Sequence, residues 1–293
     1  MAQSINRRGF LKATAKAAGL VSLAHFPYHL YARDSKRLAT DRVKLGPMGI
    51  EVSRLMMGSG TNGGGGSSNQ TRKLGVQGLG DYFRMGFDTG ITVFDTADQY
   101  GTHPHVKVGL KGLPREKVTL LTKSNALTAK DMKADIDRFR RELNSDYLDI
   151  LLMHKMEAAD WPERMKGAMD VISEAKAQGI VRSHGVSCHT LVALKAAAAT
   201  PWVEIDLARI NPAQIAMDAD PATVVGVLKE MKAAGKGVIG MKILGAGKLR
   251  DKVDEALQFA LAQDCLDCFT IGAEGRGELE DLVRKIPAAS VRG

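Results

Sequence analysis

The 293-residue sequence is poor in cysteine and in aromatic side chains, and no linker divides it. Its three cysteines, Cys188, Cys265 and Cys268, are too few for a network of disulfide bonds. Cys265 and Cys268 form a lone C-x-x-C in an apolar stretch without a second pair of metal ligands, so we expect buried structural residues. No Pro- or Ser-rich segment splits the chain, which favours one large domain.

Positive charge is abundant at the N-terminus and nearly absent as a surplus elsewhere. The formal net charge is +8 at pH 7, and residues 1–45 hold nine basic and two acidic side chains, so +7 of that charge lies there. The rest of the chain is close to neutral. This distribution argues against a broad phosphate-binding face of the kind that nucleic-acid-binding proteins carry.

The basic N-terminal segment resembles a twin-arginine export signal. Arg7 and Arg8 stand in the run Asn-Arg-Arg-Gly-Phe-Leu-Lys, and residues 17–32 that follow carry no charged side chain. Pro27 and two histidines interrupt that stretch, so we expect no stable membrane-spanning helix. The resemblance implies that residues 1–32 are a signal read by the twin-arginine (Tat) export machinery and that the protein is periplasmic. The alternative is a basic N-terminal helix on a cytoplasmic protein.

Short apolar runs alternate with amphipathic stretches from about residue 50 onward. Residues of one helical face recur every three or four positions, as in Met132, Ile136, Phe139 and Leu143. Such alternation predicts an α/β fold, a closed (β/α)8 TIM barrel over residues 40–290, with an open doubly wound sheet as the alternative. The eight predicted strands cover residues 54–57, 91–94, 118–121, 148–153, 181–186, 205–210, 238–241 and 268–271.

A smaller element precedes the predicted barrel. Residues 42–52 contain two short apolar stretches around a turn at Gly46-Pro-Met-Gly49, which predicts a β-hairpin. We expect this hairpin to plug the bottom of the barrel.

One glycine-rich segment matches a nucleotide-binding pattern. Gly58-Ser-Gly60-Thr-Asn-Gly63 fits the G-x-G-x-x-G of dinucleotide-binding Rossmann folds. The glycines continue through Gly66 into two serines, so no helix begins where the phosphates need one. We interpret the segment as a flexible loop at the upper face of the barrel, with a Rossmann site as the less favoured alternative.

Four polar residues follow three successive predicted strands. Asp95 comes directly after the strand 91–94 and Tyr100 five residues later, while Lys123 and His154 follow the next two strands. The carboxyl ends of barrel strands meet at one face, where the active sites of barrel enzymes lie. Each residue alone has a structural explanation, but the four together predict an active site.

The chemistry that this set suits is carbonyl reduction. Hydride addition develops negative charge on the carbonyl oxygen, and the phenol of Tyr100 can donate a proton there. The Lys123 cation is expected to lower the phenol pKa from its usual value of about 10. Asp95 would keep the lysine charged and positioned, and His154 would orient the carbonyl oxygen through a hydrogen bond.

These residues also resemble the motifs of the aldo-keto reductase family. Segments 94–101, 121–124 and 151–154 stand in the family's order, and the likeness covers about residues 40–287. It implies Tyr100 as proton donor and a small carbonyl substrate. NADPH, less often NADH, would bind across the barrel mouth without a Rossmann fold. The cofactor-binding positions that the resemblance implies are Ser187, Asn211, Met241, Lys242, Leu249, Gly272 and Arg276.

Several positions depart from the family's pattern. Cys188 stands where Asn is common, Met241 where an aromatic ring stacks on the nicotinamide, and Lys242 where a small polar residue is usual. Glu274 stands where the family pattern would place a basic residue. Two other functions stay open: a non-catalytic NADPH-binding regulatory or partner protein on the same barrel, and an enzyme in which Lys123 forms a Schiff base.

A metal site is not expected. His103 and His105 are close in the sequence, but no third ligand accompanies them.

Overall fold

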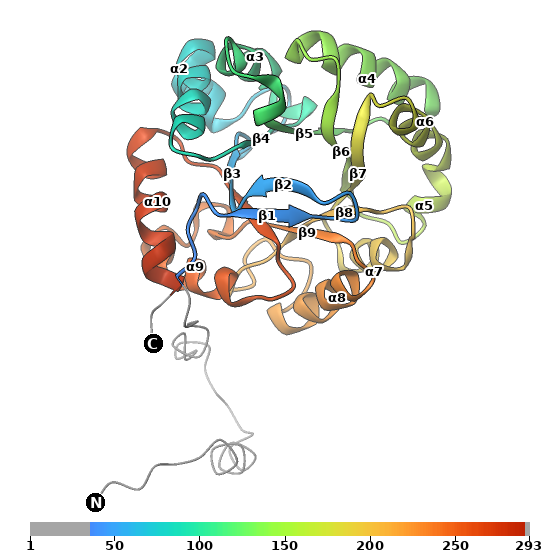
Figure 1. The fold of residues 1–293 in the computed structure, drawn as a ribbon. Helices are drawn as coiled ribbons and strands as arrows, with labels where there is room; N and C mark the ends of the chain where they lie inside the picture. The colour runs from blue at the N-terminus through green and yellow to red at the C-terminus, as the bar shows by residue number, and fades with distance from the viewer. Residues whose placement is uncertain (1–35, 291–293) are drawn as a thin grey trace, which may run out of the picture.

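The computed structural model describes residues 36–290; the predicted signal, residues 1–32, lies outside them. Eight parallel strands close into a barrel in the order β10-β3-β4-β5-β6-β7-β8-β9, and helices surround this barrel (Figure 1). The predicted (β/α)8 fold is confirmed, and the open doubly wound alternative is wrong.

Each barrel strand begins within two residues of its predicted start. The strands are β3 (Leu55–Gly58), β4 (Val93–Asp95), β5 (Thr119–Ser124), β6 (Leu148–Met156), β7 (Val181–Cys188), β8 (Ile205–Arg209), β9 (Gly237–Met241) and β10 (Cys268–Ile271). The helices around them are α2 (Asn69–Asp88), α3 (His103–Leu110), α4 (Ala129–Leu143), α5 (Trp161–Arg164), α6 (Lys166–Ala177), α7 (Leu191–Ala199), α8 (Pro221–Ala233), α9 (Val253–Ala262) and α10 (Arg276–Ser290).

Helix α4 shows how local sequence sets these elements. Thr128 precedes the helix, and its side chain accepts a hydrogen bond from the Asp131 backbone N–H at 3.2 Å; such a cap stabilises a helix by about 1 kcal/mol. Asn144 ends the helix in the left-handed conformation, with φ of 52°. The four apolar residues predicted to share one face are all buried, as the 3.6-residue period requires.

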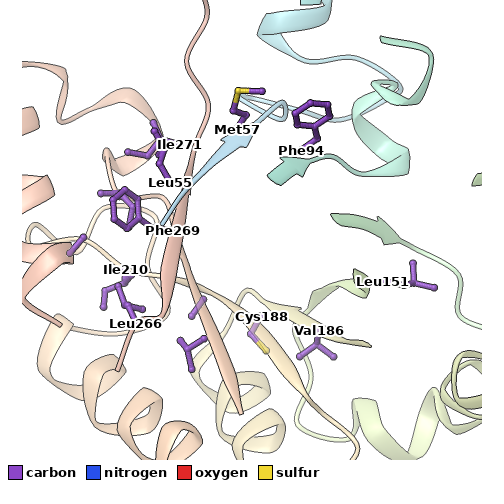
Figure 2. Packing of buried hydrophobic residues seen from close by; sticks show 14 of the residues in the cluster. Leu55, Met57, Phe94, Leu151, Val186, Cys188, Ile210, Leu266, Phe269 and Ile271 are labelled. Carbon is purple, nitrogen blue, oxygen red and sulfur yellow. The ribbon is translucent and has the colours of Figure 1, made fainter. Parts of the chain in front are cut away.

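The apolar core has two layers, because successive residues of a strand point to opposite faces. Leu151 of β6 belongs to the outer layer between strands and helices, whereas Ile150 and Leu152 belong to the layer inside the barrel. Figure 2 shows part of the outer layer, with Phe94 and Val186 on other strands directed away from the barrel interior.

A two-stranded hairpin closes the lower end of the barrel, as predicted. β1 (Arg42–Leu45) pairs antiparallel with β2 (Ile50–Ser53), and the hairpin lies across the barrel in Figure 1. Leu45 packs in the inner cluster. A Cβ at Gly237, the first residue of β9, would lie closer than 3.0 Å to the hairpin turn at Gly46. The hairpin therefore seals the amino ends of the strands.

Cys188, Cys265 and Cys268 are free and buried, so the burial predicted for the C-x-x-C pair is confirmed. Between residues 36 and 290, no helix has the length and apolar character needed to span a membrane.

Candidate active site

The four predicted catalytic residues meet at the carboxyl ends of three neighbouring strands. Asp95 is the last residue of β4, Lys123 lies near the end of β5 and His154 near the end of β6. Tyr100 ends the short 3-10 helix η3 (Asp98–Tyr100), which follows β4 after two residues. Gly101 then turns the chain with φ of 63°, a conformation that glycine adopts without strain.

A buried ion pair forms the base of the site. The Lys123 ammonium donates to Asp95 Oδ1, and to the Thr96 carbonyl at 2.8 Å. Thr270 of β10 donates to the other Asp95 oxygen at 2.7 Å. Burial lowers the pKa of Lys123, but Asp95 and Tyr100 raise it more, so the net pKa lies above the usual value. The lysine therefore stays a cation fixed in one position.

Tyr100 lies between this pair and His154. Its hydroxyl oxygen is 3.5 Å from His154 Nε2, and the two rings meet edge to face at 85°. The Lys123 Nζ lies 5.1 Å from the centre of the tyrosine ring. Both a cation and an imidazole are thus within reach of one phenol, at distances that catalytic groups often tighten when substrate binds.

The tyrosine pKa corrects one expectation. Burial raises the pKa of Tyr100 above 10.0, and although Lys123 acts to lower it, the net change is upward. The lysine effect has the predicted direction, but desolvation of the phenolate outweighs it. The resting site therefore holds a protonated phenol beside a protonated lysine.

His154 is neutral at physiological pH. Burial, followed by repulsion from Lys123, lowers its pKa to about 2. Its Nδ1 is buried and finds no hydrogen-bond partner among residues 36–290. A neutral imidazole can donate one hydrogen bond and accept another, which suits a group that orients a carbonyl oxygen.

The glycine-rich segment after β3 packs against Tyr100 and contributes to the cavity lining. A Cβ on Gly60 or Gly63 would lie closer than 3.0 Å to ring carbons of Tyr100, so only glycine allows this loop to contact the ring so closely. Helix α2 begins only at Asn69, where Ser68 caps it. The Rossmann alternative is therefore wrong.

A cavity of about 330 Å³ is lined by three of the four residues, and His154 is not in its lining. It runs from Asp95, Tyr100 and Lys123 along the loop after β9 to the loop between β10 and α10. Three predicted cofactor residues line it, namely Met241, Lys242 and Gly272. Sites of this kind at the mouth of a barrel hold small molecules or cofactors.

Ser187 and Asn211 do not line this cavity. Ser187 accepts a hydrogen bond from the Lys155 N–H at 2.9 Å. Asn211 is fully buried and holds two loops together, since its amide donates to the Ile215 and Lys242 carbonyls. The structure thus gives both side chains internal partners, and their predicted role at the nicotinamide carboxamide stays a prediction.

The other two predicted cofactor residues also lie away from the cavity lining. Leu249 is 5% exposed and packs in the outer core layer. Arg276 is 73% exposed and faces Glu280 at 3.6 Å. Arg250, which sequence reasoning missed, lines the cavity and reaches Glu274 at 3.3 Å. The sequence did offer a signal for Arg250, because this basic residue directly follows Leu249, which was predicted to bind the cofactor.

His103 belongs to a polar cluster beside the site. Its Nδ1 lies 2.7 Å from Glu142, and its Nε2 lies 2.8 Å from the Thr122 hydroxyl. Asp98 lies close enough to complete a group of three potential metal ligands, but Arg138 pairs with both Asp98 and Glu142. Because every member has a partner, we interpret the cluster as a structural network.

Comparison with known proteins decides the family. The model of the aldo/keto reductase family matches residues 54–284, which is most of the chain and includes all four polar residues of the site. The protein belongs to the aldo/keto reductase family. The predicted resemblance is confirmed at this level.

Individual relatives agree with this family. Methylglyoxal reductase YeaE of Escherichia coli is 36% identical over 142 residues, 47% of this chain and 46% of the relative. The chain spans about half the length of the curated relatives it matches.

Solved structures of aldo/keto reductases share the fold. A Pseudomonas aeruginosa protein assigned to the aldo-keto reductases superimposes with a TM-score of 0.70 at 19% identity, covering 87% of this chain and 97% of its own. An aldo/keto reductase from Klebsiella pneumoniae, solved with NADP and acetate, has a TM-score of 0.63 at 21% identity over 85% and 89%.

Proposed function

We propose that this protein uses NADPH, or alternatively NADH, to reduce an aldehyde or ketone, with Tyr100 as the proton donor. The observation that carries the proposal is the Tyr100 hydroxyl, which stands 3.5 Å from His154 and beside the buried Lys123–Asp95 pair. Family membership and the reductase names of its relatives support it.

Each residue has a task that follows from its charge and position. The neutral His154 hydrogen-bonds the carbonyl oxygen and orients it toward Tyr100. As negative charge develops on that oxygen, the phenol donates its proton. The adjacent Lys123 cation stabilises the phenolate that forms, and Asp95, held by Thr270, keeps the lysine in place.

The lining of the cavity suits a nicotinamide cofactor. It connects Asp95, Tyr100 and Lys123 with the loop before α10, and Gly272 lines it without a side chain. When bound, the dihydronicotinamide supplies the hydride. Met241 would contact the nicotinamide, and Arg250 would face the adenosine end, where a guanidinium suits a 2′-phosphate. The Klebsiella relative bound to NADP supports this choice of cofactor.

We also propose that residues 1–32 direct export to the periplasm through the Tat machinery. The proposal rests on the Arg7-Arg8 motif and the uncharged stretch after it. Tat transport moves folded proteins, so a cofactor bound in the cytoplasm could travel with the barrel.

The test compares wild-type protein with Tyr100→Phe, using NADPH and NADH against a panel of small carbonyl compounds. We expect turnover to fall about 10²- to 10⁴-fold, the usual contribution of a positioned proton donor, with cofactor affinity unchanged. Equal turnover in both proteins would sink the proton-donor role. Cofactor binding without turnover in either protein would instead indicate the non-catalytic partner function.

The Schiff-base alternative has its own readout. Borohydride would trap a carbonyl compound covalently on Lys123 if that residue formed an imine, and mass spectrometry would detect the adduct. We expect none, because the lysine is 1% exposed and ion-paired.

A further inference from the structure

Cationic side chains gather around the mouth of the barrel, and their charges act on the same imidazoles. Burial is the largest cause of the lowered pKa values of His154 and His189, and Lys123, Lys155 and Lys242 lower both further. Arg209 also lowers the pKa of His189. Most of these cations have a carboxylate partner. The pairs are Lys123 with Asp95, Lys155 with Glu157, Arg209 with Asp218 and, further along the cavity, Arg250 with Glu274.

Lys242 is different from the others. Its ammonium makes no hydrogen bond or ion pair with any residue of the described range 36–290. It is partly buried and lines the cavity together with Asp95, Tyr100 and Lys123. A cation without a counter-ion, placed in the reaction cavity, is a site for an anion.

The backbone holds Lys242 in this position. The residue follows β9 directly and has φ of 59°. This left-handed backbone conformation is uncommon for residues other than Gly, Asn or Asp. Its carbonyl accepts hydrogen bonds from Asn211 Nδ2 at 3.1 Å and from the Gly245 N–H at 2.8 Å. Strained conformations of this kind persist where the surroundings fix them, often at binding sites.

The pKa shift of Lys242 is in the direction expected for a buried cation that lacks an anionic partner. Burial lowers the pKa of Lys242, and repulsion from Arg209 and Lys123 lowers it further. Asp95 opposes this shift, but it already pairs with Lys123. An anion bound beside the ammonium would relieve both the desolvation and the repulsion.

We infer that Lys242 binds the anionic group of the substrate, so that the preferred substrates are carbonyl compounds that also carry a carboxylate. The inference rests on the proposed function, since it names the substrate class of the same site. An ammonium is a compact point charge with three donors, which suits one carboxylate.

The experiment measures kcat/KM for matched substrate pairs that differ only in the acid group, such as succinic semialdehyde against butanal and 4-carboxybenzaldehyde against 4-methylbenzaldehyde. Lys242→Gln removes the charge at similar length, and Lys242→Arg retains it. Lys248→Gln is the control, because Lys248 lies in the same loop but is exposed and does not line the cavity. Dissociation constants for NADPH and NADH are measured for every variant by fluorescence.

We expect wild-type protein to prefer the acid of each pair at least tenfold. Lys242→Gln should lower kcat/KM for the acids at least tenfold more than for their neutral partners, the size of change that loss of one charged hydrogen bond produces. Lys242→Arg and Lys248→Gln should retain the preference. Equal losses for acids and neutral partners, or weaker cofactor binding without any acid preference, would overturn the inference and assign Lys242 to the cofactor.

A binding measurement separates this inference from the proposed function. If wild-type protein reduces no carbonyl compound, calorimetry with succinate and 4-methylbenzoate on the cofactor-loaded protein still decides. Binding that Lys242→Gln abolishes and Lys248→Gln retains supports the anion site even though the reductase proposal has failed. No binding, or binding that Lys242→Gln leaves unchanged, overturns it.

Discussion

At the amino ends of its strands this barrel is closed by apolar side chains, whereas at the carboxyl ends it is lined by charges. The lower end is filled by the hairpin, with Leu45 and Ile50 packed in the inner cluster. The upper end buries Lys123 and Asp95, which are 1% and 5% exposed. Apolar packing stabilises a fold, but a buried ion pair costs desolvation that its attraction only partly offsets. The contrast separates residues kept for stability from residues kept for chemistry.

The largest expected effect comes from breaking the ion pair on one side. Lys123→Met leaves Asp95 buried without its partner, and we expect a loss of about 3–5 kcal/mol in the free energy of unfolding together with loss of turnover. The double variant Lys123→Met, Asp95→Leu should recover most of the stability and none of the activity. Chemical denaturation and turnover assays give both readouts. A double variant as unstable as the single one would mean that the pair stabilises the fold.

The matching change at the lower end should lower stability and leave turnover nearly unchanged. Leu45→Ala removes a fully buried side chain from the barrel plug, which we expect to cost about 3 kcal/mol of stability. Turnover at a temperature where the variant is folded should stay within about twofold, since the site lies at the other end of the strands. A large fall in kcat would show that the two ends are coupled.

A smaller effect is expected from the glycine loop. Gly60→Ala places a methyl group against the Tyr100 ring, and we expect kcat to fall about 10²-fold, the usual consequence of moving a reacting group by about 1 Å. Gly64→Ala is the matched control, because a Cβ there meets nothing within 4 Å. Equal kcat values for the two variants would remove the loop from the positioning of Tyr100.

The smallest effect distinguishes the two ends by pH. His154 has a pKa of about 2 and His189 of about 3, below the unfolded value of about 6.5. The unfolded chain therefore binds more protons below pH 6.5, and stability falls as the pH decreases toward the folded pKa values.

Between pH 7 and pH 5, each such histidine should remove about 2 kcal/mol from the free energy of unfolding. His154→Gln should make the loss over this interval smaller by that amount in denaturation measurements. A variant with the same pH dependence as wild-type protein would show that His154 is not held neutral by the fold. Leu45→Ala should leave the pH dependence unchanged, since it removes no titratable group.

The fold was predictable because local patterns encode it directly. Alternating apolar runs and amphipathic stretches set the order of strands and helices. Strands with Asp95, Lys123 and His154 at or near their carboxyl ends must deliver these residues to one face. The net rise in the Tyr100 pKa was not predictable, because desolvation depends on how much protein surrounds the phenol. The internal hydrogen bonds of Asn211 were equally hidden, since they join loops that lie far apart in the sequence.

The sequence by itself determined the barrel, the hairpin plug and the four polar residues, because periodicity and strand ends are local properties of the chain. Only the tertiary structure decided which side chains share the cavity. It brought Arg250 to that cavity, placed Gly60 and Gly63 against Tyr100, and gave Lys242 no counter-ion among residues 36–290. Contact and charge pairing between distant segments follow from packing, and no single stretch of sequence contains that information.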